Sequence, residues 1–383
     1  MFDNAFKDNI VGAVSCDAQF LRAALDKAFL AVNAKLKVPA LHHVLVRNDK
    51  LYATDMEMMI FVDLPPGSCS GSAFLTDPER LLAILKTADG RITVEGRRQD
   101  VKDGDAICSI LVRAGDASIW SPSCPVEDFP ALDRLKEAKE RLTLTAEQLA
   151  LAFSCVAPAI STEATRYYLN GICFDMRSEP AGFTMAATDG HRLATFDFPV
   201  EPKVAMKPII PKLAITSLQK LLKGSRSDVL LKIGDTRAEF SSADWALTTK
   251  LIDGSFPEYG RVAATSLESK GTANWVVSAD KAAFASTLAR VHIQGKSAPV
   301  KLTSSGELVS GNQVDGQASA PISGALITGV PQDVGFNGKY FAEALKSAPG
   351  DRISLFFQDP GGPFLLKVPG RDDWSTTLMP LRL

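Results

Sequence analysis

The chain has 383 residues, of which 46% are hydrophobic and 22% charged, and its formal net charge is −2. This length exceeds one ordinary hydrophobic core and predicts two or three domains. The sequence shows neither an apolar run of the roughly eighteen residues that cross a membrane nor the apolar core of a signal peptide. We therefore expect a cytoplasmic globular protein without membrane association, and the charge neither predicts nor excludes nucleic-acid binding.

Six stretches place apolar residues at the spacing of an amphipathic helix. In chain order they are DAQFLRAALDKAFLAV from Asp17, DPERLLAILKTA from Asp77, AEQLALAFSCVAPAI from Ala146, PKLAITSLQKLLKG from Pro211, ADKAAFASTLARVHI from Ala279 and NGKYFAEALKSAPG from Asn337. Asp77 followed by Pro78 is typical of an N-cap and a first helical position. GRITVEG, SDVLLKIG and GDRISLFF follow the second, fourth and sixth stretches and predict strands.

The order helix, strands, helix, strands recurs about every 130 residues, a third of the chain. HHVLVRNDKLYAT and TRYYLNGICFDM alternate apolar and polar residues and predict further strands. CPVEDFPALDRLKEAKE from Cys124 and VAATSLESKGTA from Val262 combine proline or glycine with charge and predict linkers. The sequence thus predicts three copies of one α+β unit, each with two helices packed on an antiparallel sheet.

The cysteines and histidines show no metal-ligand spacing, so we expect reduced thiols and neither a metal nor a cofactor. The six cysteines are Cys16, Cys69, Cys108, Cys124, Cys155 and Cys173. Basic residues lie in or beside the predicted helices. Each one suits a solvated helix face, whereas together on one concave side they would attract phosphate. They are Arg22, Lys27, Lys35, Lys86, Lys212, Lys220, Lys223, Lys281, Arg290 and Lys346.

The polar stretch AATDGHRLATF, residues 186–196, places Asp189 and His191 two residues apart, on one face if it is a strand. A catalytic pair, a turn closed by hydrogen bonds and a ligand pocket are the three possible interpretations. No serine- or cysteine-centred elbow such as G-x-S-x-G accompanies the pair, which disfavours a hydrolase. The residues alone leave the turn and the pocket open.

Segments in all three thirds of the chain resemble the β subunit of bacterial DNA polymerase III, the sliding clamp family. They are YATDMEMMI (52–60), VEDFPALD (126–133), TRYYLNGICFD (165–175), ATDGHRLA (187–194), KLIDGSFPEYGRV (250–262), GFNGKYF (335–341) and MPLRL (379–383). The resemblance implies clamp domains at 1–125, 126–262 and 263–383, and two chains closed head-to-tail into a six-domain ring around duplex DNA. It implies a non-catalytic processivity factor that tethers DNA polymerase and is opened by an ATP-driven clamp loader.

The resemblance also assigns a pocket for short peptides of the polymerase, the clamp loader and other replication and repair proteins. Its implied residues are Leu169, Thr188, Gly190, His191, Arg192, Leu193, Pro257, Arg261, Val262, Asn337, Tyr340, Pro363, Met379, Pro380, Leu381 and Arg382. Leucine and methionine side chains would accept apolar anchors, while the arginines and His191 would hydrogen-bond the peptide. DNA contacts are implied at Arg22, Lys35, Arg166, Tyr167, Tyr168 and Lys220, and a dimer interface at Ile119, Ala289 and Arg290.

The pocket positions depart from the family pattern. Gly361 and Pro363 stand where the family typically carries valine and serine, Thr377 where an aliphatic residue is common, and Gly260 where arginine is frequent. A valine lost from a pocket wall removes apolar contact that contributes about 1 kcal/mol. We therefore expect generic clamp-binding peptides to bind this chain more weakly than ordinary clamps.

The ring positions depart as well. Glu163 would repel phosphate where the family can place a neutral glutamine, and Ala289 and Arg290 replace a pair of large aliphatic residues at the ring interface. A clamp-derived partner-binding protein that closes weakly, or no longer encircles DNA, is therefore the alternative to a divergent sliding clamp.

Overall fold

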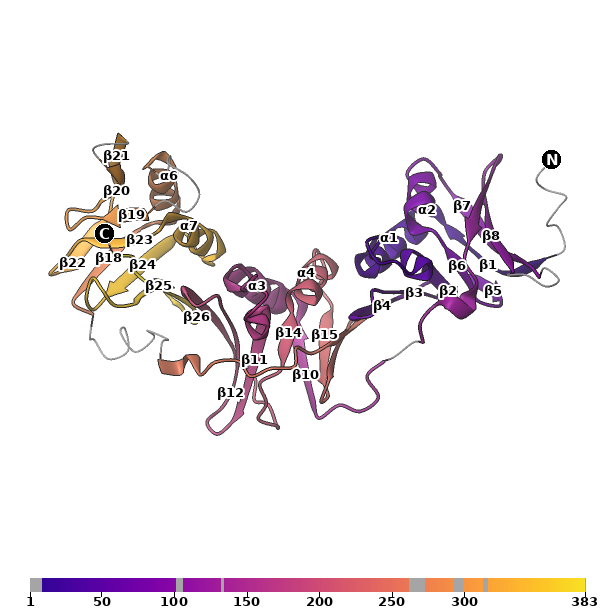
Figure 1. Ribbon diagram of the computed structural model, residues 1–383, viewed down its shortest axis with the longest axis horizontal. Coiled ribbons are helices and arrows are strands. Elements are labelled where there is room, and N and C mark those ends of the chain that lie inside the picture. The colour runs from indigo at the N-terminus through magenta and orange to yellow at the C-terminus, as the bar shows by residue number, and fades with distance from the viewer. Residues whose placement is uncertain are drawn as a thin grey trace. The chain divides into compact units, whose positions relative to one another are not determined.

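The computed structural model describes residues 9–100, 106–131, 134–261, 273–291, 299–312 and 316–382. The α-helices in these ranges, two in each third of the chain, coincide with the predicted stretches and confirm them (Figure 1). They are α1 (Ala18–Ala28), α2 (Pro78–Leu85), α3 (Ala146–Val156), α4 (Lys212–Leu221), α6 (Lys281–Val291) and α7 (Gly338–Ser347).

Side-chain caps explain where three of these helices begin. Asp17, Asp77 and Asn337 each accept backbone amides of the first helical turn, at distances from 2.9 to 3.4 Å. Such caps satisfy amides that have no partner inside a helix. The Asp77–Pro78 start is therefore confirmed. Asn337, assigned above to the peptide pocket, has its side chain committed to the start of α7.

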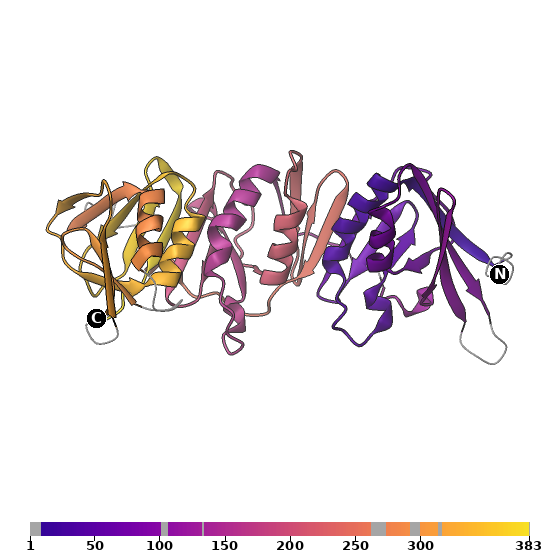
Figure 2. The ribbon, with the colours of Figure 1, turned by 90° about the horizontal axis from the view of Figure 1, so that it is seen from above.

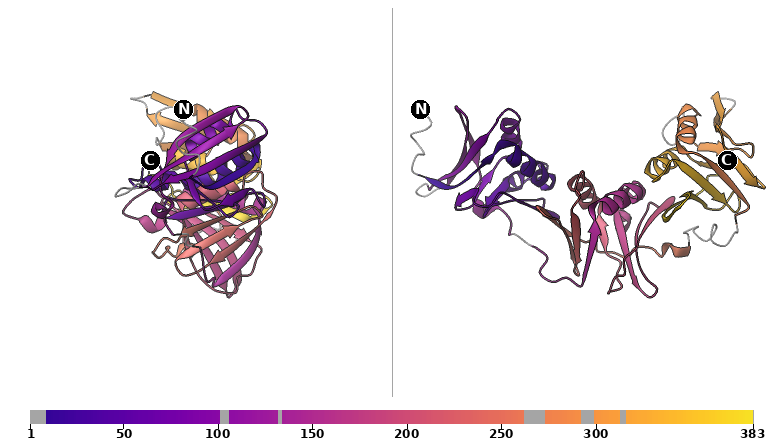
Figure 3. Two further views of the ribbon diagram at one scale, coloured as in Figure 1. Left: turned by 90° about the vertical axis from the view of Figure 1, so that its right-hand side faces the viewer. Right: turned by 180° about the vertical axis from the view of Figure 1, so that it is seen from behind.

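The chain divides into two compact units, residues 1–146 with 216–250 and residues 147–215 with 251–383. This division does not test the three predicted domain boundaries, which stay predictions. In the first unit α1 and α2 lie side by side, and in the second unit α6 and α7 do so (Figure 2). Figure 3 shows both helix pairs from behind.

The first unit holds two antiparallel sheets. The smaller sheet has the order β5 (Cys69–Gly71), β1 (Ile10–Asp17), β7 (Arg91–Gln99), β8 (Ile107–Ala114) and β9 (Ala117–Ser123). The larger sheet has the order β10 (Glu140–Thr145), β15 (Asp228–Ile233), β16 (Arg237–Ser241), β17 (Trp245–Lys250), β4 (Met58–Asp63), β3 (Lys50–Thr54), β2 (Val44–Arg47) and β6 (Phe74–Thr76).

The second unit also holds two antiparallel sheets. The larger has the order β14 (Ile209–Pro211), β11 (Gly171–Ser178), β12 (Ala181–Thr188), β13 (Arg192–Phe198), β26 (Arg371–Leu378), β25 (Phe364–Val368), β24 (Arg352–Phe357), β18 (Trp275–Asp280) and β22 (Leu326–Gly329). The smaller has the order β21 (Gly316–Pro321), β20 (Glu307–Asn312), β19 (Pro299–Leu302) and β23 (Val334–Asn337).

Each larger sheet joins strands from two thirds of the chain. In the first unit β4 pairs with β17, with Ile60 opposite Leu247. In the second unit β13 pairs with β26, with Leu193 opposite Thr377. The smaller sheets instead end in β9 and β21, each of which has one hydrogen-bonded neighbour strand in the described part of the chain.

One predicted strand is partly wrong. Within TRYYLNGICFDM, Tyr167–Leu169 form a 3₁₀ helix, η5, and β11 begins only at Gly171. The turn is closed by Leu169 N to Arg166 O and by Asn170 N to Tyr167 O, both at 2.9 Å. A side chain at Gly171 would lie 2.3 Å from the carbonyl oxygen of Ile210 in β14, so the strand begins where only glycine fits.

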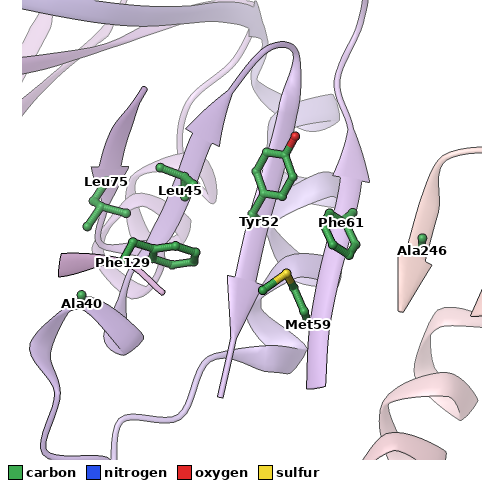
Figure 4. Close-up of a cluster of buried hydrophobic side chains, with 8 residues drawn as sticks. All are labelled: Ala40, Leu45, Tyr52, Met59, Phe61, Leu75, Phe129 and Ala246. Atoms are coloured by element: carbon green, nitrogen blue, oxygen red, sulfur yellow. The ribbon is translucent and has the colours of Figure 1, made fainter. Parts of the chain in front are cut away.

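The predicted linker after Cys124 is packed against the first unit. Phe129 lies in a buried cluster with residues of β2, β3, β4, β6 and β17 (Figure 4). Arg134 lies over the Phe61 ring at 5.0 Å and pairs with Glu239 at 3.0 Å. Burial alone would raise the pKa of Glu239, but hydrogen bonds from Arg134 and Lys232 hold this pKa below its ordinary value. The other predicted linker, from Val262, lies almost wholly outside the described residues.

The β3–β4 connection is a side-chain-closed turn. Thr54 Oγ1 donates to Met58 O at 2.8 Å, and Asp55 Oδ1 accepts the amides of Glu57 and Met58 at 3.0 and 2.8 Å. Met56, at the tip, has a φ of +75° and is 52% exposed. A left-handed conformation is unfavourable for a residue with a side chain, so this turn carries strain at Met56.

Replacing Met56 with glycine is expected to raise the free energy of unfolding of the first unit by about 1 kcal/mol, because glycine adopts a positive φ without strain. Urea unfolding of the full chain measures the change. Met56→Ala is the matched control, since it removes the exposed side chain and keeps the strain. A glycine variant no more stable than the alanine variant would contradict the interpretation.

Candidate functional site

The turn that contains Asp189 repeats the Thr54–Met58 turn in the second unit. Thr188 Oγ1 donates to Arg192 O at 2.6 Å, and Asp189 Oδ1 accepts the amides of His191 and Arg192 at 2.9 and 3.1 Å. The same bonds hold a turn that carries Met, Glu and Met in the first unit. The position of Asp189 is therefore explained by turn closure, not by a partnership with the His191 ring.

Gly190 fits the tip of this turn for two reasons. Its φ is +89°, and a side chain there would lie 2.6 Å from Nη1 of Arg166. Arg166 Nη2 also donates to the carbonyl oxygen of Asp189 at 3.1 Å. The DGHR segment is thus held by the hydrogen bonds within its own turn and also by Arg166.

Arg192 is the most constrained residue of the site. It is only 7% exposed, and its Nε donates to Asp189 Oδ2 at 3.1 Å while its Nη1 pairs with Glu343 of α7 at 2.7 Å. Its Nη2 donates to the carbonyl oxygen of Pro158, in the 3₁₀ helix η4 (Ala157–Ala159). All three guanidinium nitrogens therefore have protein partners, so Arg192 joins the turn, η4 and α7 rather than offering a free donor to a peptide.

Aromatic contacts complete this junction. The guanidinium carbon of Arg192 lies 4.6 Å from the centre of the Tyr340 ring. The exposed His191 ring stacks on the same tyrosine at 5.8 Å between centroids and 21° between planes. His191 and Tyr340 thus form a partly exposed aromatic surface above a buried cation, on which an apolar or aromatic side chain can pack.

The C-terminal tail lies beside the turn. Met379 N donates to His191 O at 2.9 Å, and Leu381 N donates to Gly335 O of β23 at 2.8 Å. Met379, Leu381 and Arg382 are exposed, and Pro380 is half-buried. Half-buried Pro363 directly precedes β25, whose first residue pairs with the last residue of β26, so it lies near the start of the tail.

A buried apolar cluster lies under the same region. Leu169 and Leu193 belong to it, together with Cys173, Ala186, Ile209 and Phe256, and Tyr168, Ile252 and Tyr259 pack against it. Exposed Pro257 follows Phe256, and Arg261 ends the 3₁₀ helix η6 (Tyr259–Arg261). Val262 lies outside the described residues. The cluster therefore connects two predicted pocket residues with the segment that carries Pro257 and Arg261.

The residues assigned to DNA lie in both units. Arg22, Lys35 and Lys220 are exposed residues of the first unit, whereas Arg166, Tyr167 and Tyr168 belong to the second unit, where Arg166 bonds the Asp189 turn. Tyr167 is 53% exposed, and its ring meets that of Tyr168 edge to face. Tyr167 is therefore largely open to solvent, while Tyr168 packs against the apolar cluster.

Glu163 does not stand as an isolated negative charge. Arg166 donates to its two carboxylate oxygens at 2.8 and 2.7 Å. These hydrogen bonds lower the pKa of Glu163 and raise that of Arg166. The repulsion of phosphate expected from Glu163 is thus offset by Arg166, and Arg166 in turn is engaged by protein groups.

The residues assigned to the dimer interface lie on β9 and α6. Ile119 is 38% exposed on the edge strand β9, and the next residue, Trp120, is 42% exposed. Because side chains alternate along a strand, these two residues lie on opposite faces of the sheet. Ala289 and Arg290 are exposed in the last turn of α6, where Arg290 donates to Thr287 Oγ1 at 3.1 Å.

Sequence reasoning missed Trp120, Glu343 and Tyr259. Trp120 could have been noticed in ASIWSPS as the largest apolar residue of its strand, but the open edge that makes it significant is a property of the sheet. Glu343 lies in the helical pattern of α7 as an ordinary polar residue, and its partner Arg192 is distant in sequence. Tyr259 stands inside the FPEYGRV segment, yet no sequence signal distinguishes it from a surface residue.

The described ranges hold no group of three or more His, Cys, Asp or Glu side chains that could bind a metal ion. All six cysteines are free thiols. Burial raises the pKa of Cys16 to about 11 and the pKa values of Cys155 and Cys173 to about 12, so these three stay protonated at neutral pH. Among the described helices, none has the length and apolar character to cross a bilayer.

Comparison with known families agrees with this geometry. Residues 143–258 match the central domain of the DNA polymerase III beta subunit, and residues 271–382 match its C-terminal domain. The beta sliding clamp of Caulobacter vibrioides is 29% identical over 382 residues, covering 94% of this chain and 98% of that one. The chain belongs to the β sliding clamp family. It is a divergent clamp and, like the family, a non-catalytic subunit of DNA replication.

Other clamps extend the comparison. The beta sliding clamp of Pseudomonas putida is 25% identical over 364 residues, covering 92% of this chain and 95% of that one. Crystal structures of the Caulobacter crescentus clamp and of the Bartonella birtlesii clamp bound to griselimycin superpose with TM-scores of 0.85 and 0.83. Each is 27% identical to this chain, and each superposition covers 97% of this chain and 99% of the other. The clamp fold therefore extends over nearly the whole chain.

Proposed function

We propose that this clamp encircles duplex DNA as a head-to-tail dimer and holds DNA polymerase, clamp loader and other replication or repair proteins through short peptides. The peptides bind at the peptide pocket, defined as the predicted pocket residues of the second unit together with Glu343. The observation that carries the proposal is Arg192, whose buried guanidinium joins the Asp189 turn, η4 and α7 beside the C-terminal tail.

The chemistry of the pocket suits a short peptide with apolar anchors. Exposed Met379 and Leu381 lie beside the His191–Tyr340 surface, and methionine adapts to side chains of different shape. Buried Leu169 and Leu193 belong to the apolar cluster, and Leu193 pairs with Thr188 of the Asp189 turn. Because Arg192 is already bonded, His191 and Arg382 are exposed donors that remain for the peptide backbone.

Ring closure is supported by the pattern of the sheets. Each larger sheet continues from one third of the chain into the next, through β4–β17 and through β13–β26. The two smaller sheets end in the edge strands β9 and β21. Pairing β9 of one chain with β21 of another would form a third junction of the same kind and would bring Ile119 and Trp120 of the first chain to the end of the partner's smaller sheet.

Weaker peptide binding than in an ordinary clamp is the expected result of the pocket substitutions. Gly361 and buried Thr377 replace the valine and the aliphatic residue that are typical of the family, and this loss of apolar side-chain surface predicts a dissociation constant about tenfold higher. Titration of one labelled peptide with leucine and phenylalanine anchors into this clamp and into the Caulobacter clamp measures the difference. Equal affinities would contradict the expectation, and no binding at all would contradict the proposed pocket.

The second candidate function is that of a clamp-derived protein that binds partners but closes weakly. Ala289 and Arg290 favour it, because the last turn of α6 exposes one small and one charged side chain where an interface needs apolar anchors. Both candidates share the peptide pocket. They differ in whether the protein is a dimer in solution and is retained on DNA.

A further inference from the structure

The segment 251–261 is fixed to the second unit along its length. Ile252 N donates to Ile209 O at 3.0 Å, and Phe256 is buried in the apolar cluster. Glu258 pairs with Lys207 at 2.8 Å, and the Tyr259 hydroxyl donates to Asp175 Oδ2 at 2.7 Å. Of these attachments, only the last ends on a buried carboxylate.

Asp175, on β11, depends on few donors. Its Oδ2 accepts from Tyr259 and from Arg177 Nη1 at 3.1 Å, while its buried Oδ1 has no hydrogen-bond partner among the described residues. Arg177 is held in turn by Thr184 Oγ1 at 3.0 Å. A buried carboxylate is destabilising unless donors surround it, so the Tyr259 hydroxyl is an important part of its environment.

Tyr259 is also linked to the peptide pocket. Its ring packs against the apolar cluster that contains Leu169 and Leu193, and it meets the Phe256 ring edge to face at 6.2 Å. Burial and the bond to Asp175 raise the pKa of Tyr259, so its hydroxyl remains a donor at any physiological pH. Pro257 and Arg261 lie two residues before and two residues after it in the chain.

We infer that Tyr259 is a positioning residue for the peptide pocket. Its hydroxyl, bonded to Asp175, fixes the segment 251–261 so that exposed Pro257 is presented to the peptide. The inference rests on the proposed peptide-binding function and assigns Tyr259 and Asp175 a role in it, although neither need touch the peptide.

Tyr259→Phe tests the inference, because it removes the hydroxyl and keeps the ring in the apolar cluster. Tyr52→Phe is the matched control, since buried Tyr52 packs edge to face on Phe61 in the first unit as half-buried Tyr259 does on Phe256. Two quantities are measured in the full-length wild type and both variants. They are hydrogen exchange of the 251–261 amides and the affinity for the labelled peptide with leucine and phenylalanine anchors.

Loss of a hydrogen bond to a charged group predicts about tenfold faster exchange of the 251–261 amides in Tyr259→Phe and a peptide dissociation constant raised by about fivefold to tenfold. Tyr52→Phe should change neither. Unchanged exchange in Tyr259→Phe would overturn the inference. Faster exchange with wild-type peptide affinity would also overturn it, because the segment would then be fixed by Tyr259 without serving the pocket.

The wild-type titration separates this inference from the proposed function. Absence of peptide binding by the wild type would overturn the proposed pocket and, with it, the positioning role. Wild-type binding that Tyr259→Phe leaves intact would overturn the positioning role alone. A further variant, Asp175→Asn, should weaken peptide binding in the same direction, because it alters the acceptor of the same hydrogen bond.

Discussion

Replacing Arg192 with alanine is expected to abolish detectable peptide binding and to lower the free energy of unfolding of the second unit by about 3–5 kcal/mol. The guanidinium is buried and bonded to Asp189, Glu343 and the Pro158 carbonyl, so its loss removes one donor from each of these three acceptors. The Tyr340 ring also loses the cation beneath it.

The controls for this prediction are variants of Arg166 and of Arg192 itself. Arg166→Ala removes a more exposed arginine that bonds Glu163 and the Asp189 carbonyl, so it should lower the free energy of unfolding far less than Arg192→Ala. Arg192→Lys keeps the charge but cannot reach three partners with one ammonium group, so an intermediate loss is expected. Urea unfolding and peptide titration measure both properties. Wild-type peptide affinity in Arg192→Ala would contradict the assigned role.

Replacing Ile119 and Trp120 together with aspartate is expected to make the protein monomeric at micromolar concentration. The two exposed side chains lie on opposite faces of the edge strand β9. In the dimer they would bury their apolar surface against the partner's smaller sheet. Loss of a tryptophan anchor alone typically costs about 2 kcal/mol or more, which raises a dimer dissociation constant about thirtyfold. Burying the two new aspartate carboxylates at the dimer interface adds a desolvation penalty.

Light scattering on a sizing column measures the change, since the mass should fall from about twice to about once the 41.1 kDa of one chain. Val38→Asp is the control, because Val38 is an exposed apolar residue of the same unit that lies off the sheet edge. A double variant that remains dimeric would place the interface elsewhere. Should the wild type itself be monomeric, the weakly closing alternative would be favoured, as Ala289 and Arg290 suggest.

The helices could be predicted from the sequence because their signals are local. Asp17, Asp77 and Asn337 cap the helix that follows each of them within a few residues, and the apolar spacing within each helix reports its buried face. The repeat of these signals gave the threefold organisation. The failure at Tyr167–Leu169 has a non-local origin instead, because the strand begins at Gly171, where it closely approaches β14.

The roles of individual site residues could not be predicted in the same way. The DGHR motif alone suggests that Arg192 is a free donor. In the structure its nitrogens instead bond Glu343 and Pro158, both far from it in sequence. Tyr259 and Asp175 meet across 84 positions of the chain. Such pairs form only when sheets and helices have been assembled, so a pattern within one segment does not predict them.

Topological retention on DNA tests the central claim most directly. The wild-type clamp is incubated with a nicked circular plasmid, its own clamp loader and ATP, and then separated from free protein by gel filtration before and after the plasmid is cut once. A closed ring predicts that the clamp elutes with the circle and is released when the DNA becomes linear. Failure to stay with the circle, or equal retention on linear DNA, would contradict the account of this protein as an encircling clamp.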